Sequence, residues 1–223
     1  MSRPMIQAVA FDLDGLMFDT EALFFKVASE MLSKRGKVFT HEMMSAMIGR
    51  RAVLAYPAFK RIAELTESPE ELQAEARGLF FEQIDTAVHP TAGLFVLLQT
   101  LERLKIPTAV CTSSRREYAE RLLSQHGILT HFSYLLTAED VVEGKPNPEI
   151  YLKAAARFEI EPAHLLVLED SPAGVTAGKA AGAFTVGVPH DHSPVGPLAL
   201  ASLVVERLDA PELLALLGPP EAV

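Results

Sequence analysis

The sequence predicts an α/β protein with a Rossmann-like parallel sheet core and an inserted all-helical cap domain. Three observations support this prediction. Short apolar runs of strand length alternate with helical patterns along most of the chain, one long segment near the start contains helical patterns only, and polar residues follow several of the apolar runs. Alternating strands and helices are typical of βαβ units, in which the strands are parallel and helices cover both faces of the sheet.

The predicted strands are short apolar runs. The first, IQAVAF at residues 6–11, ends directly before an aspartate. A strand that is buried on both faces, as parallel strands are, shows such a nearly continuous apolar pattern. Further strands are expected at residues 108–111, 134–136, 165–168, 184–188 and 202–205.

Helical patterns separate these strands. Apolar residues recur there at intervals of three and four, the spacing that places them on one face of a helix. The predicted helices cover residues 93–104, 116–126, 148–158, 173–181 and 211–217. Each lies between or after predicted strands, as the βαβ arrangement requires.

The segment from residue 20 to residue 87 is the exception, because it contains no convincing strand. Helical patterns cover residues 21–35, 41–47, 51–65 and 69–86. We therefore expect residues 1–19 and 88–223 to form the α/β core domain, and residues 20–87 to form a helical cap domain. An insert after the first strand would lean over the carboxyl ends of the strands, where open α/β folds bind ligands.

Composition limits the classes of partner. The formal net charge is −9 and the isoelectric point is near 5.3. Nucleic acids and anionic membranes are bound through clustered Lys and Arg, so neither is expected as a partner. No run approaches the roughly 18 uninterrupted apolar residues of a membrane span.

Cysteine usage and the amino-terminal sequence indicate a compartment. The single cysteine, Cys111, excludes an internal disulfide framework and a Cys-rich zinc site. The amino-terminal residues lack the pattern of a secretory leader. We therefore expect a cytoplasmic protein. We also expect a monomer that acts on a small phosphorylated molecule or another small ligand.

The first predicted strand ends in two acids one residue apart, Asp12 and Asp14, followed by Gly15. Alternate strand residues point to one face, so both side chains can address a ligand at the strand tip. Two close carboxylates favour a hard cation such as Mg²⁺. They could also divide nucleophilic and acid–base work between them. A solvated turn or a simple capping role remains the alternative.

The second strand ends in CTSS, residues 111–114. Hydroxyls and backbone N–H groups that lead into a helix form an anion site, because unpaired donors and the helix dipole converge there. Thr112 is the favoured contact. In the alternative interpretation, Ser113 or Ser114 only caps a helix that begins at Arg115.

Two further segments carry charged residues after strands or before helices. Lys145 lies in a turn made rigid by Pro146 and Pro148, and supplies a fixed positive charge for a phosphoryl group or a carboxylate. Glu169 and Asp170 follow another buried strand and add oxygen ligands, although Asp170 or Ser171 could instead cap the next helix. Because parallel strands share one carboxyl edge, these groups are expected to form one site with Asp12.

Taken together, these motifs resemble those of the haloacid dehalogenase superfamily of phosphohydrolases, in the branch with a helical cap that includes β-phosphoglucomutase. DLDGLMFDTE, CTSS, GKPNPEIY and LEDSPAG resemble its four motifs in order. The resemblance implies a phosphoric monoester hydrolase, a phosphatase that cleaves a small phosphorylated metabolite such as a sugar phosphate with Mg²⁺ and an aspartyl-phosphate intermediate.

The resemblance also implies roles for individual residues. Asp12 is the nucleophile, and Asp14 is the general acid–base whose backbone carbonyl also binds Mg²⁺. Thr112 and Lys145, with the Ser113 backbone, hold the phosphoryl oxygens. Asp170 completes the metal site, with Glu169 as a further metal-site acid.

Two departures from the resemblance bear on a phosphosugar mutase as the alternative activity. Phe24 stands where β-phosphoglucomutases carry a cap histidine, and no mutase-type cap arginine is cleanly placed. Arg50 and Arg51 are the candidate substrate contacts from the cap, with a solvated helix start as their alternative. Both departures favour a phosphatase.

An alternative of another class is a non-catalytic, phospho-accepting signalling domain. Such domains also combine acids, a hydroxyl and a lysine at the strand ends of a parallel sheet. They lack a helical insert, so residues 20–87 and Asp14 argue against this alternative.

Overall fold

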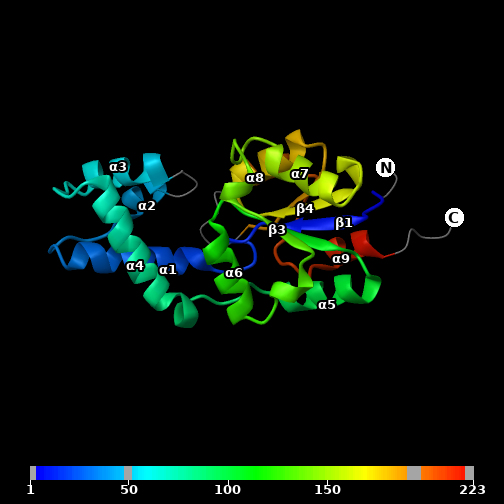
Figure 1. The fold of residues 1–223 in the computed structure, drawn as a ribbon, viewed down its shortest axis with the longest axis horizontal. Coiled ribbons are helices and arrows are strands. Elements are labelled where there is room, and N and C mark those ends of the chain that lie inside the picture. The colour runs from blue at the N-terminus through cyan, green and yellow to red at the C-terminus, as the bar shows by residue number, and fades with distance from the viewer. Residues whose placement is uncertain (1–3, 48–51, 190–196, 219–223) are drawn as a thin grey trace. The chain divides into compact units, whose positions relative to one another are not determined.

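The computed structural model describes residues 4–47, 52–189 and 197–218. The chain divides into two compact units (Figure 1). The first consists of Met1–Asp19 and Pro90–Val223, and the second of Thr20–His89.

A six-stranded sheet forms the centre of the first unit, in the order β3-β2-β1-β4-β5-β6. Every neighbouring pair is parallel. The strands are β1 (Ala8–Phe11), β2 (Thr108–Cys111), β3 (Tyr134–Leu136), β4 (Leu165–Glu169), β5 (Phe184–Gly187) and β6 (Leu203–Val204). The strand order reverses direction at β1, so the crevice beside β1 is the point at which such sheets bind ligands.

The register of the central strands aligns their carboxyl ends. Phe11 of β1 pairs with Val110 of β2 and with Leu168 of β4. The next residues along these strands, Asp12 and Glu169 among them, therefore lie at the same edge of the sheet. All residues of β1, β2 and β4 are buried, which explains why their sequences are apolar up to this edge.

Helices cover both faces of this sheet (Figure 1). Helices α7 and α8 lie on one face, and α5 and α9 lie on the other. The helices of this unit are α5 (Leu94–Leu104), α6 (Arg116–Gln125), α7 (Glu149–Arg157), α8 (Pro172–Ala180) and α9 (Pro211–Leu217). Short 3₁₀ turns occur at Leu129–His131, Ala138–Asp140, Pro162–His164 and Pro197–Leu200.

Helix α5 shows how the pattern directs packing. Its buried residues Leu94, Leu97, Leu98 and Leu101 recur at the helical spacing, so they form one apolar stripe.

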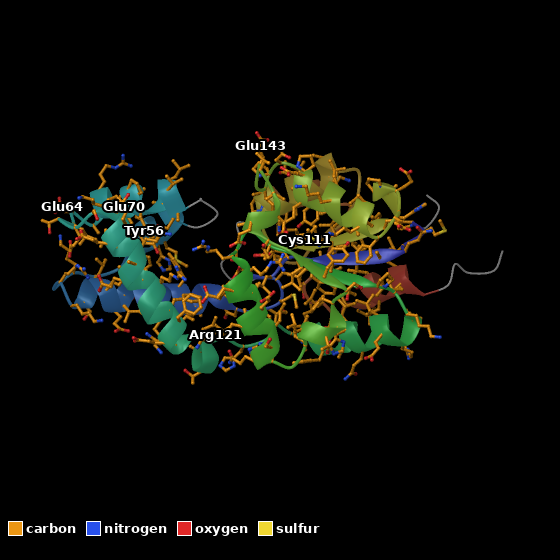
Figure 2. The ribbon with its side chains drawn as sticks, in the orientation of Figure 1. Tyr56, Glu64, Glu70, Cys111, Arg121 and Glu143 are labelled. Atoms are coloured by element: carbon orange, nitrogen blue, oxygen red, sulfur yellow. The ribbon has the colours of Figure 1, made fainter. Side chains whose placement is uncertain are left out.

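On the opposite face of the sheet, α7 and α8 contribute to a cluster that includes Tyr151. Cys111 lies within that cluster and is fully buried (Figure 2). Burial raises its pKa to about 12, so Cys111 serves as a small core residue.

In its described residues, the second unit contains helices joined by loops and no strand. Its helices are α1 (Thr20–Ser33), α2 (His41–Met47), α3 (Ala52–Ile62) and α4 (Pro69–Ala87). Ser68 caps α4 and exchanges hydrogen bonds with Glu71 in a capping box. Arg35 joins the helices through ion pairs of 2.7 Å with Glu67 and 2.6 Å with Glu75.

The predicted fold class is confirmed, since the sheet is parallel and carries helices in the Rossmann-like manner. The predicted strands and helices are present, with shifted ends. Within the described part of the chain, no helix is both long and apolar enough to cross a membrane.

Candidate active site

Lys145 lies at the centre of the carboxyl edge of the sheet. Its ammonium donates hydrogen bonds to Asp12 Oδ1, to Glu169 Oε1 at 2.6 Å and to the Cys111 carbonyl oxygen at 2.8 Å. The Lys145 side chain is 5% exposed. One side chain therefore joins the ends of β1, β2 and β4, which are far apart in the sequence.

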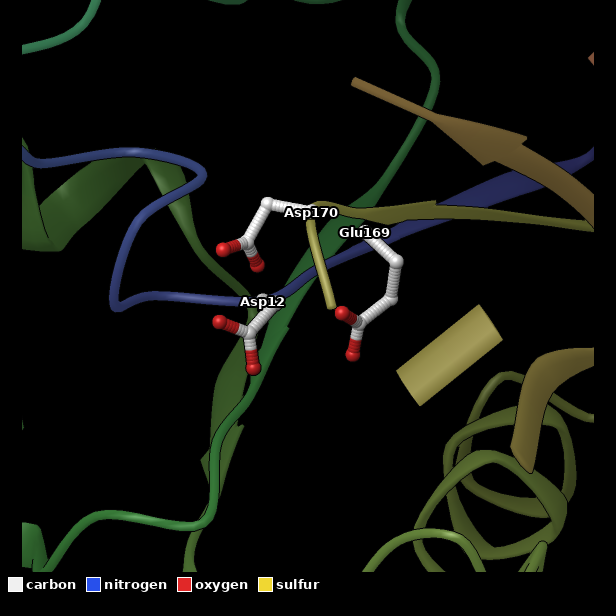
Figure 3. Close-up of side chains that lie close together, drawn as sticks. All are labelled: Asp12, Glu169 and Asp170. Atoms are coloured by element: carbon white, nitrogen blue, oxygen red, sulfur yellow. The ribbon is translucent and has the colours of Figure 1, made fainter. Parts of the chain in front are cut away.

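Three carboxylates meet beside this lysine. Oxygen atoms of Asp12, Glu169 and Asp170 all lie within 4.8 Å of one another, and all three residues are buried. Figure 3 shows their side chains converging from the ends of two neighbouring strands. The structure thus brings together the predicted nucleophile, the predicted lysine and the second pair of acids.

Glu169 is the most firmly held of the three. Its Oε1 accepts a hydrogen bond of 2.6 Å from the Tyr151 hydroxyl. Its Oε2 accepts hydrogen bonds from the Ser171 hydroxyl at 2.9 Å and the Ser171 amide at 3.2 Å. A Cβ added at Gly174 would lie 1.7 Å from Glu169 Oε1, so only glycine leaves room for this carboxylate against α8.

The charges in the cluster do not balance. Burial raises the pKa of Asp12; Lys145 opposes this effect, whereas the Glu169, Asp170 and Asp14 carboxylates add to it. Burial alone would lower the pKa of Lys145, but attraction from Asp12 and Glu169 raises it above the ordinary value. Lys145 thus stays protonated, and one ammonium faces three acidic side chains.

The cluster fits a hard divalent cation. Mg²⁺ takes oxygen ligands, and a carboxylate group of this kind offers them at short mutual distances. A dication would also offset the excess negative charge that Lys145 leaves. Asp12, Asp170 and Glu169 are the side chains that would hold it, although the contacts of Glu169 with Lys145, Tyr151 and Ser171 occupy part of that carboxylate.

Asp14 is close in sequence to this cluster but holds a different set of partners. Its Oδ2 accepts a hydrogen bond of 2.6 Å from the Ser114 hydroxyl, and its Oδ1 accepts one of 2.6 Å from the Tyr118 hydroxyl. The chain turns at Gly15, whose φ of 82° favours glycine. The Asp14 carboxylate is outside the group of three close carboxylates.

The segment after β2 contains the predicted anion site. Thr112 is buried, and its hydroxyl accepts a hydrogen bond of 2.9 Å from the Ser114 amide. Ser113 is exposed. Helix α6 has Arg115 at its N-cap position without a side-chain cap, so neither Ser113 nor Ser114 caps this helix. The capping interpretation is therefore wrong for both serines.

The cap of α8 is Ser171 and not Asp170. The Ser171 hydroxyl accepts a hydrogen bond of 3.0 Å from the Gly174 amide. The Asp170 carboxylate therefore belongs to the group of three close acids without serving as the helix cap.

Arg115 lies at the margin of the site. Arg115 pairs with Glu139, and its side chain is 70% exposed. The candidate substrate contacts Arg50 and Arg51 lie outside the described residues.

Two tyrosines of the site are absent from the sequence-based prediction. Tyr151 contacts Glu169, and Tyr118 contacts Asp14 across 104 positions of sequence. Tyr151 follows the predicted lysine by six residues in a helical pattern, so its burial could be predicted but its partner could not. For Tyr118, the sequence carries no signal that separates it from a surface tyrosine.

Comparison with known proteins identifies the family. The family model described as haloacid dehalogenase-like hydrolase matches residues 9–188. The matched segment contains the whole carboxyl edge of the sheet from Asp12 to Asp170. The chain therefore belongs to the haloacid dehalogenase-like hydrolase family.

Individual relatives and structures are similar over nearly the whole chain. Validoxylamine A 7'-phosphate phosphatase of Streptomyces hygroscopicus subsp. limoneus is 33% identical over 92% of this chain and 95% of the relative. The phosphorylated carbohydrates phosphatase of Thermotoga maritima is 28% identical over 83% and 86%. A crystal structure from Thermotoga maritima, provisionally named as a beta-phosphoglucomutase, superimposes with a TM-score of 0.81 at 27% identity, covering 95% of this chain and 98% of its own.

These relatives confirm two predictions made from the sequence. The resemblance to the superfamily is correct, and the protein is an enzyme of the phosphoric monoester hydrolase class. The roles of the individual residues remain to be proposed from their geometry.

Proposed function

We propose that the protein is a Mg²⁺-dependent phosphatase that hydrolyses a small phosphomonoester, such as a sugar phosphate, through an aspartyl-phosphate on Asp12. The observation that carries the proposal is the contact of the Lys145 ammonium with both Asp12 and Glu169, next to Asp170. It supplies a nucleophile, a fixed positive charge and cation ligands in one buried place.

The first half of the reaction transfers the phosphoryl group to Asp12. A carboxylate oxygen of Asp12 attacks phosphorus, and the bond from phosphorus to the ester oxygen breaks. Lys145, Thr112 and the Ser113 backbone hold the phosphoryl oxygens, which lowers the repulsion between two anions. Asp14 gives its proton to the departing alkoxide.

The second half regenerates Asp12. Asp14, now ionised, takes a proton from a water molecule whose oxygen attacks phosphorus, and the bond to Asp12 breaks. When bound, Mg²⁺ would supply positive charge that favours phosphoryl transfer. Asp12, Asp170 and Glu169, with the backbone carbonyl of Asp14, would hold this ion.

The helical unit belongs to the proposal as the source of substrate selectivity. We propose that residues 20–87 act as a cap, with Arg50 and Arg51 as candidate contacts for the substrate. The acidic net charge argues against nucleic acid and anionic membranes as partners, and the single cysteine fits a reducing, cytoplasmic setting. We further propose a monomer that acts on a small metabolite.

A phosphosugar mutase is the second candidate, because of the structural similarity to the Thermotoga maritima protein. A mutase returns the phosphoryl group to the sugar, whereas a phosphatase releases it to water. Phe24 offers no acid–base group at the position where the resemblance places a cap histidine. The phosphatase is therefore the preferred function.

A panel of phosphorylated metabolites tests the proposal. Inorganic phosphate would be measured for each ester with Mg²⁺ and with a chelator. We expect multiple turnovers that require Mg²⁺, with Asp12→Asn reducing kcat by at least about a thousandfold while the thermal unfolding profile is retained. Glu159→Gln, which removes an exposed carboxylate, is the matched control and should keep full activity.

Two results would contradict the proposal. Asp12→Asn that still releases phosphate at the wild-type rate would exclude Asp12 as nucleophile. Conversion of one β-glucose phosphate isomer into another without net phosphate release would identify a mutase.

A further inference from the structure

Asp14 has an arrangement that the proposed reaction leaves unexplained. Each of its two carboxylate oxygens accepts one hydroxyl hydrogen bond, from Ser114 on Oδ2 and from Tyr118 on Oδ1, both at 2.6 Å. Both donors come from the segment after β2 and the first turn of α6. The carboxylate is thereby fixed in rotation by two donors on one structural element.

The donors leave the carboxylate able to react. An ionised carboxylate has about four lone-pair sites, and the two hydroxyls occupy two of them. One site on each oxygen remains for a proton.

Tyr118 is the donor that lies within a helix. Its hydroxyl stands at the end of a ring with only two side-chain torsions, on the third residue of α6. The next residue, Ala119, is fully buried, which anchors this turn of the helix in the core. Ser114 lies before the helix, where the Thr112 hydroxyl accepts a hydrogen bond from its amide.

We propose that Tyr118 is a positioning residue that holds the Asp14 carboxylate for proton transfer. The inference rests on the proposed function. In the second half of the reaction, the water oxygen forms a bond to phosphorus, its proton passes to Asp14, and the electron pair of the breaking bond returns to Asp12. Tyr118 keeps its own proton throughout and acts only through Asp14.

The two halves of the reaction depend differently on Asp14, which gives the inference a specific kinetic signature. A nitrophenolate leaves as a stable anion, so transfer from p-nitrophenyl phosphate to Asp12 does not need the Asp14 proton. For glycerol phosphate, the departing alkoxide does need the Asp14 proton. Breakdown of the aspartyl-phosphate needs Asp14 as a base with either ester.

The test compares Tyr118→Phe with the wild-type enzyme on both esters in the presence of Mg²⁺. For p-nitrophenyl phosphate, we expect kcat to fall roughly tenfold to a hundredfold. The KM value should fall by a similar factor, so kcat/KM stays within about twofold of the wild-type value because phosphorylation is unaffected. For glycerol phosphate, kcat/KM itself should fall.

A second readout reports the intermediate directly. Acid quench during turnover, followed by intact-mass analysis, should show a larger phosphorylated fraction for Tyr118→Phe than for the wild type. Ser114→Ala, which removes the other donor, should show the same signature if Tyr118→Phe does not fold. Tyr134→Phe is the matched control, because the Tyr134 hydroxyl donates to the Ala154 carbonyl at 2.7 Å and contacts neither Asp14 nor Lys145 in any described hydrogen bond.

The contradicting results are distinct. An unchanged kcat, or equal losses of kcat and kcat/KM for p-nitrophenyl phosphate without accumulation of phosphorylated protein, would overturn the role of Tyr118. A wild-type enzyme that turns over neither ester would overturn the proposed function itself, and the inference with it.

Discussion

At the scale of single residues, Lys145 holds the buried cluster together, and we propose that it also acts in the chemistry. Its ammonium is the positive charge that contacts Asp12 and Glu169, and its side chain is almost completely buried. A buried charge pair is strongly destabilised when one partner is removed, because the remaining charges stay buried without compensation. The same ammonium is available to a phosphoryl group.

Lys145→Met should therefore destabilise the protein as well as inactivate it. We expect a loss of about 3–5 kcal/mol in the free energy of unfolding at neutral pH without divalent cations. Addition of Mg²⁺ should recover part of this loss, because a bound cation offsets the carboxylates. Urea denaturation with and without Mg²⁺ measures both effects.

Lys34→Met is the control for that experiment. The Lys34 side chain is 52% exposed and pairs with Glu30, so its removal should cost less than about 1 kcal/mol. The loss of unfolding free energy caused by Lys145→Met should also become smaller as the pH falls. The pKa of Asp12 is raised, so its protonation is favoured in the folded state and removes one of the repelling charges. Equal stabilities of the two variants at neutral pH would show that Lys145 does not compensate the cluster.

At the scale of elements, the segment before α7 places Lys145. Glu149, at the start of α7, accepts hydrogen bonds from the backbone amides of Val142 at 3.1 Å and Glu143 at 2.9 Å, and pairs with Lys153 at 2.6 Å. These contacts close the loop that carries Lys145. Backbone hydrogen bonds and Lys153 lower the pKa of Glu149 to about 2.

The lowered pKa gives a prediction with a defined sign. Glu149 stabilises the folded state at pH values above its ordinary value of 4.5, and this contribution is lost as the pH falls through about 2. At about pH 3.5, the Glu149 carboxyl carbon should still show the ionised chemical shift by NMR, while that of an exposed glutamate is largely protonated. A normal titration near the ordinary value would contradict the loop contacts.

Removal of this carboxylate should loosen the loop. Glu149→Gln is expected to speed hydrogen exchange at the Val142 and Glu143 amides, relative to Glu159→Gln, which changes an exposed residue. Unchanged exchange at both amides would show that Glu149 does not hold the loop.

At the scale of the whole molecule, the helical unit is inserted at one point of the α/β unit. Phe18 and Pro90 form an antiparallel bridge, and the Thr91 amide donates to the Met17 carbonyl at 2.9 Å. The two ends of the insert therefore emerge from neighbouring backbone positions. A short connection could join them without distortion of the sheet.

Replacement of Thr20–His89 by a short Gly/Ser linker should leave a folded core. We expect a single cooperative unfolding transition, since the sheet and the helices on both of its faces belong to that unit. Phosphoryl transfer from p-nitrophenyl phosphate should persist at a reduced rate, with loss of discrimination among natural esters. A core that does not unfold cooperatively would show that the insert is needed for the fold.

Much of this architecture could be predicted from the sequence, for identifiable reasons. Strands β1, β2 and β4 are buried on both faces and are therefore apolar up to the residue where the chemistry begins. Since parallel strands share one carboxyl edge, the meeting of Asp12 with Glu169 and Asp170 followed from topology alone.

Some parts of the site could not be predicted in this way. The contact of Tyr118 with Asp14 depends on how α6 rotates against the loop after β1, and neither local sequence contains that information. The partners of Glu169 likewise depend on the absence of a side chain at Gly174 on a neighbouring helix. Such contacts depend on how neighbouring elements pack. The positions of the strand ends, by contrast, can be predicted from the sequence pattern within each strand.

The most direct test of the central claim is to locate the phosphoryl group during turnover. The enzyme would be mixed with an excess of substrate and Mg²⁺ and quenched in acid, and the peptide containing Asp12 and Asp14 would be fragmented in a mass spectrometer. The account predicts one phosphoryl group on the Asp12 side chain, more abundant in Asp14→Asn with an activated ester. Phosphate release at the full rate with Asp12 never modified, or a phosphoryl group on Asp14 instead, would contradict it.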